Sequence, residues 1–144
     1  MTMTNSALQA RVKDFNWLLS SFAENTTGVE QSICVSADGL LMAMSSSLDR
    51  GSADKLAAIV SGLRSLSDGA SRVMGRGGVN QVIVEMQEGF MFASSIGHGS
   101  SLGVLTSRSV DLGLVGYAMT LVVQRVGAQL SPELITELKN SLGR

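Results

Sequence analysis

Charged residues are scarce in this chain. They make up 16% of its 144 residues, against roughly 25% in an average soluble domain, and 11 basic side chains nearly balance 12 acidic ones. This balance provides no basic surface for phosphate groups, so we expect no nucleic-acid partner. Because hydrophobic residues reach 44%, we expect another chain to cover part of the apolar surface.

Cysteine, histidine and proline occur once each. The single Cys34 excludes an internal disulfide and a zinc site built from cysteines alone, and it is typical of the reducing cytoplasm. The single His98 lies between two glycines, where we expect an exposed turn and no catalytic base. Since no metal-ligand spacing and no catalytic constellation stand out, we expect no metal, no cofactor and no enzyme activity.

A length of 144 residues fits one domain around a single core. We expect one domain over residues 1–144, with its core at about 7–127 and a short tail helix at about 131–142. The N-terminus lacks the apolar run of a signal peptide. The longest stretch without Asp, Glu, Lys or Arg, 89–107, is rich in Gly and Ser and alternates like strands. We therefore expect a cytoplasmic protein that does not insert into a membrane.

The first predicted helix spans residues 7–23. Its apolar side chains recur at intervals of four and three residues and form one stripe. They are Leu8, Val12, Phe15, Leu19 and Phe22. Trp17 falls nearly opposite this stripe, where it either packs on a neighbouring helix or contacts a partner.

Alternating and β-branched residues predict two groups of strands. The first is a hairpin of residues 29–36 and 40–44, joined by Asp38-Gly39, because Gly accepts the positive φ of a tight turn. The second group comprises strands at 79–86, 90–96 and 102–106. The strand at 79–86 has apolar side chains on both faces, which is typical of a sheet covered on both sides.

Two longer helices and a tail helix complete the prediction. The helix over about 53–74 takes Ser52 as its N-cap, and the glycines at 75–78 end it. Its apolar stripe consists of Leu56, Ile59, Leu63, Leu66, Ala70 and Val73. The helix over 112–129 is apolar nearly all round, with one stripe continued on the other side by Leu114, Tyr117 and Leu121, so we expect it to be sandwiched.

A second face of the middle helix consists of small residues. They are Ala58, Gly62, Ser65 and Gly69, offset by two residues from the apolar stripe. Each glycine inside a helix costs roughly 0.8–1.0 kcal/mol relative to alanine. Two explanations remain: the close approach of a helix from a second subunit, or a chance run of small residues.

Apolar motifs around an Asp-Gly turn carry a resemblance to a known family. They are Trp17-Leu-Leu…Phe22, Val29-Glu…Val35-Ser-Ala-Asp-Gly-Leu-Leu41, Val82-Ile-Val-Glu85, Leu102-Gly-Val-Leu105 and Leu112-Gly-Leu-Val115. In this order they resemble the Roadblock/dynein light chain family over roughly residues 7–127. The opening motif and the tail are similar to bacterial members encoded beside a sensor kinase and a small Ras-like GTPase.

The resemblance implies an α+β fold, a Roadblock/profilin-like sandwich. Its elements follow the order α-β-β-α-β-β-β-α, and its five-stranded antiparallel sheet has the strand order 2-1-5-4-3. One helix covers one face of the sheet and two cover the other. Family members form homodimers by pairing the middle helix and the third strand across a two-fold axis. In this sequence the implied interface contains Ala58, Gly62, Ser65, Gly69, Val82 and Val84.

The resemblance also implies a function. Family members are non-enzymatic platforms that bind or regulate small GTPases, or that link dynein cargo. Since this chain lacks recognisable GTP-binding loops, we expect a scaffold that binds a small Ras-like GTPase in bacterial signalling, with a sensor kinase as a second candidate partner. Trp17, Arg64, Arg72 and Arg76 are candidate partner contacts. The arginines either stabilise charge on a transferring phosphate or are solvated helix charges, and we favour the latter.

A different class of protein is the alternative. A sensory module of the PAS or GAF kind would bind a small ligand between the sheet and a helix. Eight methionines and few polar core residues would suit an apolar ligand, but filling of gaps in the core accounts for methionine more simply.

Overall fold

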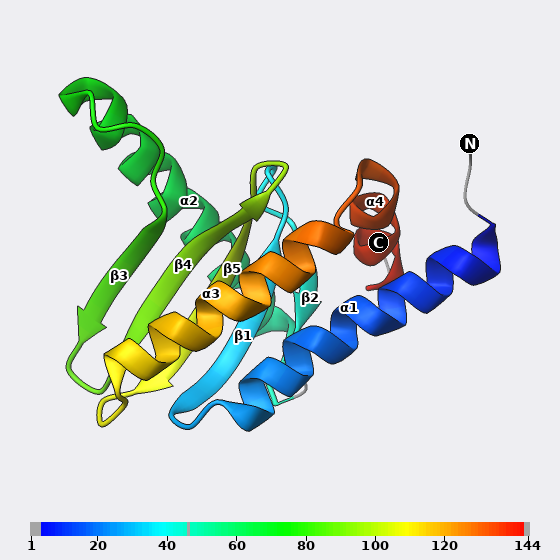
Figure 1. Cartoon of the computed structure of the whole chain (residues 1–144), viewed down its shortest axis with the longest axis horizontal. Helices are drawn as coiled ribbons and strands as arrows, with labels where there is room; N and C mark the ends of the chain where they lie inside the picture. The colour runs from blue at the N-terminus through cyan, green and yellow to red at the C-terminus, as the bar shows by residue number, and fades with distance from the viewer. Residues whose placement is uncertain (1–3, 46, 143–144) are drawn as a thin grey trace.

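A five-stranded antiparallel sheet forms the centre of the molecule (Figure 1). The computed structural model describes residues 4–45 and 47–142. The strands are β1 (Val29–Val35), β2 (Leu41–Met44), β3 (Gln81–Met86), β4 (Gly89–Gly97) and β5 (Ser100–Ser107). Their order in the sheet is β2-β1-β5-β4-β3. This order and the α+β class confirm the fold that the family resemblance implies.

Helices cover both faces of the sheet. They are α1 (Asn5–Asn25), α2 (Arg50–Met74), α3 (Leu112–Gln129) and α4 (Pro132–Ser141). Figure 1 shows α2 behind the sheet and the other three helices in front of it. Two buried clusters follow these layers, one around Phe15, Phe92 and Leu134, and one around Ile33 and Val60.

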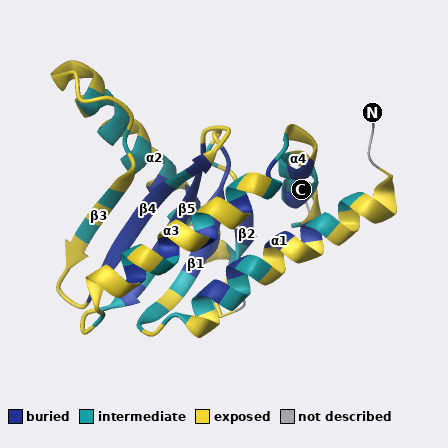
Figure 2. Cartoon of the chain, viewed as in Figure 1, coloured by how far each residue is buried: buried dark blue, intermediate teal, exposed yellow. Residues whose placement is uncertain are grey.

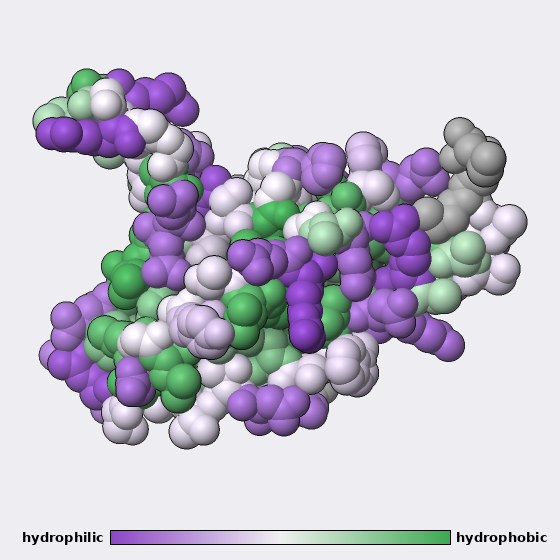
Figure 3. Space-filling model, in the orientation of Figure 1, coloured by the Kyte–Doolittle hydropathy of each residue, from purple (hydrophilic) through white to green (hydrophobic). Residues whose placement is uncertain are grey.

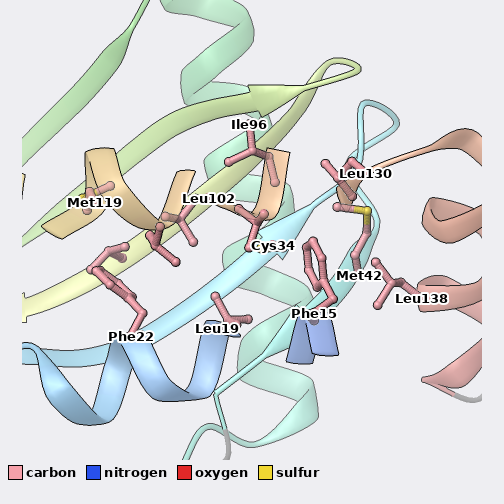
Figure 4. Packing of buried hydrophobic residues seen from close by; sticks show 14 of the residues in the cluster. Phe15, Leu19, Phe22, Cys34, Met42, Ile96, Leu102, Met119, Leu130 and Leu138 are labelled. Atoms are coloured by element: carbon pink, nitrogen blue, oxygen red, sulfur yellow. The ribbon is translucent and has the colours of Figure 1, made fainter. Parts of the chain in front are cut away.

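The larger cluster confirms the stripe predicted on the first helix. Val12, Phe15, Leu19 and Phe22 are all buried, while Trp17 is exposed on the opposite side. Figure 4 shows Phe15, Leu19 and Phe22 pointing from α1 towards the sheet. The helix begins after Thr4, whose hydroxyl accepts a hydrogen bond from the Ala7 N–H. The spacing of apolar residues therefore determines which side of α1 faces the sheet.

The helix α4 packs into the same cluster. Leu134 and Leu138 are fully buried, and Figure 4 shows Leu138 next to Met42 of β2. The Ser131 hydroxyl caps the helix by accepting the Leu134 N–H, and Lys139 Nζ lies 3.1 Å from Asp38 Oδ2 in the β1–β2 turn. The helix α4 thus forms a third element of the layer that contains α1 and α3.

The turn at Asp38 is stabilised by side chains around its carboxylate. Ser36 donates a hydroxyl hydrogen bond to Asp38 and Lys139 contributes a second one, and together they lower the pKa of Asp38 below its ordinary value. Gly39 adopts a φ of +81°, which confirms the predicted Asp-Gly turn. The turn fixes the register of β1 against β2, with Cys34 opposite Ala43.

The helix α2 differs from the sequence prediction at its start and in its buried face. Its N-cap is Asp49, whose carboxylate accepts the Ser52 N–H, so the prediction of Ser52 as N-cap is wrong. The side chains buried against the sheet are Ala53, Ala57 and Val60. At its other end, Gly75 caps the helix with a φ of +64°, as predicted.

Close packing on β5 explains which face of α2 is buried. A Cβ atom at Gly103 of β5 would lie only 2.9 Å from Val60 Cγ2, so the helix lies close to the strand and small side chains fit between them. Several members of the predicted apolar stripe point away from this contact. Leu66 and Val73 are 76% and 84% exposed, and Ile59 is also exposed. The stripe is therefore not the buried face of α2.

The predicted burial of β3 on both faces and of α3 on all sides is also wrong for the single chain. The strand β3 is an edge strand, and its Ile83 is exposed although the sequence predicted cover on both faces. On α3, the side chains of Leu114, Tyr117 and Leu121 are exposed, so this helix is packed on one side and not sandwiched. The reason is the layer arrangement, because α3 contacts α1 and β4, and no element of the described residues lies outside it.

Two glycines of α3 predict opposite effects of alanine on stability. A Cβ at Gly127 would lie 2.9 Å from the backbone oxygen of Ile96, whereas one at Gly116 would meet nothing within 4 Å. We expect Gly116→Ala to raise the free energy of unfolding by up to about 0.8–1.0 kcal/mol through helix propensity. Gly127→Ala should lower it, because the helix must move away from β4. Urea unfolding of both variants measures this difference, and equal stabilisation by both would contradict the close approach.

Candidate interaction surfaces

The exposed side of α2 and the edge strand β3 form the first candidate surface, which we call the α2–β3 surface. Its α2 part combines exposed small and large apolar side chains. They are Ala58, Ile59, Gly62, Ser65, Leu66 and Val73. Figure 2 shows exposed and half-buried residues along β3 and along the part of α2 that projects beyond the sheet. Extended apolar surface of this kind is typical of a protein interface.

Gly62 and Gly69 of α2 have no packing partner among the described residues that requires a glycine. A Cβ at Gly62 would meet nothing within 4 Å, and one at Gly69 would meet only Arg72 Nη2, at 3.8 Å. Alanine at either position would favour the helix by roughly 0.8–1.0 kcal/mol. A helix backbone that approaches from outside the chain would require small residues here.

The predicted residues of β3 lie on the same side of the sheet as α2. Val82 and Val84 are half-buried and pack against the cluster beneath α2. Within the described sheet, β3 pairs with β4 alone, from Gln81 opposite Ser94 to Met86 opposite Gly89. Its outer N–H and C=O groups can therefore pair with a strand of another chain. The structure thus brings the α2 and β3 members of the predicted interface to one side of the sheet.

The four candidate partner contacts do not form one surface. Arg64 is largely buried, and its Nη1 lies 2.7 Å from Ser101 Oγ, so this guanidinium attaches α2 to β5. Arg72 and Arg76 are exposed at the C-terminal end of α2. Trp17 lies on α1, on the opposite side of the sheet.

Trp17 instead lines a groove between α1 and α3, which we call the α1–α3 groove. It has a volume of about 330 Å³. Its lining consists of Trp17, Leu18, Ser21, Phe22, Asn25 and Thr26 from the first helix and its end, and of Ala118, Leu121, Val122 and Arg125 from the third. The sequence prediction missed this groove, although a helix that is apolar nearly all round was a signal for it.

The single cysteine and the single histidine lie in different parts of the fold. Cys34 is fully buried in β1, and burial raises the pKa of its thiol far above the ordinary range. His98 is exposed in the β4–β5 turn at a φ of +54°. Within residues 4–45 and 47–142, no group of three His, Cys, Asp or Glu side chains could hold a metal ion. Across the same residues, none of the helices combines the length and the hydrophobicity that a membrane span needs.

Burial predicts that Cys34 is unreactive in the folded protein. The thiolate form of cysteine is the nucleophile. In the folded chain the raised pKa keeps Cys34 in the thiol form, and burial keeps reagents away from its sulfur. We expect Ellman's reagent at pH 8 to modify the native chain at least about a hundredfold more slowly than the urea-unfolded chain, which is the control. Rapid modification of the native protein would contradict a closed core around β1.

Comparisons with known proteins agree with this fold. The sequence matches the Roadblock/LC7 domain over residues 15–106. A Roadblock/LC7 domain from Streptomyces avermitilis is 37% identical, with a TM-score of 0.73, and the match covers 77% of this chain and 92% of that one.

More distant solved structures share the fold. Myxococcus xanthus MglB is 15% identical with a TM-score of 0.74, covering 80% of this chain and 93% of that one. The gliding protein MglB from Thermus thermophilus is 13% identical with a TM-score of 0.72, covering 88% and 93%. No curated protein is significantly similar in sequence. The domain match and the Streptomyces structure together show that this chain belongs to the Roadblock/LC7 family.

Proposed function

We propose that this protein is a non-enzymatic, homodimeric scaffold that binds a small Ras-like GTPase in the bacterial cytoplasm. The observation that carries the proposal is the α2–β3 surface, which is exposed and apolar in a chain that belongs to the Roadblock/LC7 family. The family resemblance implies platforms that bind or regulate such GTPases. A sensor kinase is the second candidate partner of the dimer.

Dimerisation through this surface would pair the free edge of β3 and bury the exposed apolar side chains of α2. Pairing of β3 with its copy would hydrogen-bond the free edge and join two five-stranded sheets. Packing of α2 against its copy would bury Ile59, Leu66 and Val73 and would use the small side chain of Gly62. A two-fold axis brings the same surface of each subunit together, which suits a face that combines large and small residues.

Two measurements test the proposal separately. Light scattering of the full chain at micromolar concentration should give the mass of a dimer, and a monomer would contradict the assembly. The immobilised chain should capture a small GTPase from a lysate of its host, with an amount that changes when a GTP analogue replaces GDP. A tightly bound small molecule with no GTPase would instead support the sensory-module alternative.

The exposed arginines should matter little for hydrolysis. An arginine that stabilises a transferring phosphate contributes roughly 10³–10⁵ to the rate, but Arg72 and Arg76 are solvated at the end of α2, and Arg64 is held by Ser101. We expect alanine at Arg72 or Arg76 to weaken GTPase binding less than about tenfold and to leave hydrolysis nearly unchanged. Loss of stimulated hydrolysis by orders of magnitude in either variant would show a catalytic arginine.

A further inference from the structure

We propose that the α1–α3 groove is a second docking site, which binds one amphipathic, acidic helix of a partner protein. This site goes beyond the proposed dimer and GTPase scaffold. It lies on the face of the sheet opposite α2 (Figure 1), so it shares no residue with the α2–β3 surface.

Trp17 and Leu121 are large exposed apolar side chains in the lining of this groove, and Leu114 and Tyr117 extend the exposed apolar face of α3 beside it. Trp17 and Tyr117 are each 65% exposed, and Leu114 and Leu121 are also exposed. On α3 they follow intervals of three and four residues, so Leu114, Tyr117 and Leu121 lie on one side of the helix. Figure 3 shows hydrophobic surface along α3 and between α3 and α1. Single exposed apolar residues are ordinary, whereas two in one groove that continue into an exposed apolar helix face indicate an interaction site.

The shape of the groove suits a helix. Its walls are formed by two adjacent helices that lie side by side on the sheet. A third helix can place its side chains between those of α1 and α3, as ridges fit into grooves in helix packing. Partner helices of this kind present apolar residues at positions i, i+3, i+4 and i+7.

The charge of the groove selects an acidic partner. Among the described residues that line the groove, Arg125 alone is charged, and the other polar side chains, Ser21, Asn25 and Thr26, are neutral. Among the described residues, no hydrogen bond or ion pair engages the Arg125 guanidinium, in contrast to Arg64 and Arg108, which pair with carboxylates. A carboxylate beside the apolar face of the docked helix would pair with Arg125.

A second copy of the chain fits this site less well. A two-fold contact centred on the groove would place one concave surface against another and would bring Arg125 close to the partner's Arg125. Like charges at short distance oppose such a contact. The proposal therefore assigns the groove to a different protein, and a copy of this chain becomes an outcome of the test.

Trp17 is the sole tryptophan of the chain and lies in the groove, so it reports directly on docking. The probes are two synthetic helical peptides without Trp or Tyr. Both carry Leu at positions i, i+3, i+4 and i+7, and beside this face one carries Glu and the other carries Lys. We expect the Glu peptide to shift Trp17 emission to shorter wavelength at micromolar concentration and to bind at least about tenfold more tightly than the Lys peptide.

Variants of the full chain complete the experiment. Arg125→Glu should reverse the preference between the peptides, and Leu121→Glu should weaken both at least about tenfold. Arg76→Glu is the matched control, because Arg76 is exposed at the end of α2, and it should preserve the preference. Circular dichroism checks that each variant is folded.

Three results would overturn the proposal. They are absence of binding by both peptides, equal binding by both, and a preference that Arg125→Glu leaves unchanged. A concentration-dependent shift of Trp17 emission without peptide, lost in Leu121→Glu, would assign the groove to a second copy and would also overturn it. Since none of these readouts requires a GTPase, failure here leaves the proposed scaffold function standing, and loss of GTPase binding leaves this site standing.

Discussion

Replacing Gly62 with leucine should convert the dimer that we propose into a monomer at micromolar concentration. A Cβ at Gly62 meets nothing within 4 Å, so the side chain enters space outside the chain and not its own core. In the paired arrangement that space belongs to the α2 helix of the other subunit, and a leucine there would separate the two helices. We expect the dissociation constant to rise at least about a hundredfold, or roughly 2.7 kcal/mol.

Gly116→Leu is the matched control for this prediction. Gly116 also lies inside a helix, and a Cβ there likewise meets nothing within 4 Å, but it is on α3, across the sheet from α2. Both variants should remain folded, because leucine favours a helix more than glycine does. Light scattering and sedimentation should show a dimer for Gly116→Leu alone. A dimeric Gly62→Leu variant would move the interface away from the middle of α2.

The elements of this fold could be predicted because their signals are local. The repeat of apolar residues determines the buried face of α1, and the Asp-Gly pair determines the β1–β2 turn. The order of strands in the sheet is different, because it depends on contacts between distant segments. It came from the family resemblance and not from periodicity.

The buried face of α2 could not be predicted from hydrophobicity, because packing distance decided it. Ala53 and Ala57 face the sheet, while the larger Leu66 and Val73 remain exposed. Gly103 on β5 permits the close approach of α2. A glycine in the sequence does not show, however, which helix packs against it. The N-cap is a similar case. Asp49 and Ser52 are both suitable residue types, and only the backbone geometry separates them.

The candidate sites show the same division. The small residues of α2 were visible as a pattern, because glycine inside a helix is costly. The α1–α3 groove was not visible, since its walls come from helices that are about 100 residues apart in the sequence. The excess of apolar residues on α3 instead predicts burial, which is wrong for the outer side of the helix. An apolar face predicts contact with another protein surface, either in the same chain or in a partner. Within the described residues, no element covers the outer side of Leu114 and Leu121.

Replacing Leu138 with alanine should be among the most destabilising single changes in this chain. Leu138 is fully buried in the larger cluster, next to Met42. Truncation of a buried leucine costs about 2–5 kcal/mol, from the lost transfer free energy and from the cavity that remains. The helix α4 lies near the end of the chain, so a tail that merely rested on the surface would give a much smaller effect.

Leu114→Ala is the control that distinguishes an α4 helix packed into the core from a tail that rests on the surface. Leu114 is also a helical leucine, but it is 51% exposed, so we expect a change within about 0.5 kcal/mol. Because assembly contributes to the measured stability, both variants and the unmodified chain must be unfolded in urea at one protein concentration. Similar values for Leu138→Ala and Leu114→Ala would show that α4 is dispensable. A loss of several kcal/mol in Leu138→Ala alone would show that α4, together with α1 and α3, closes the core on this face of the sheet.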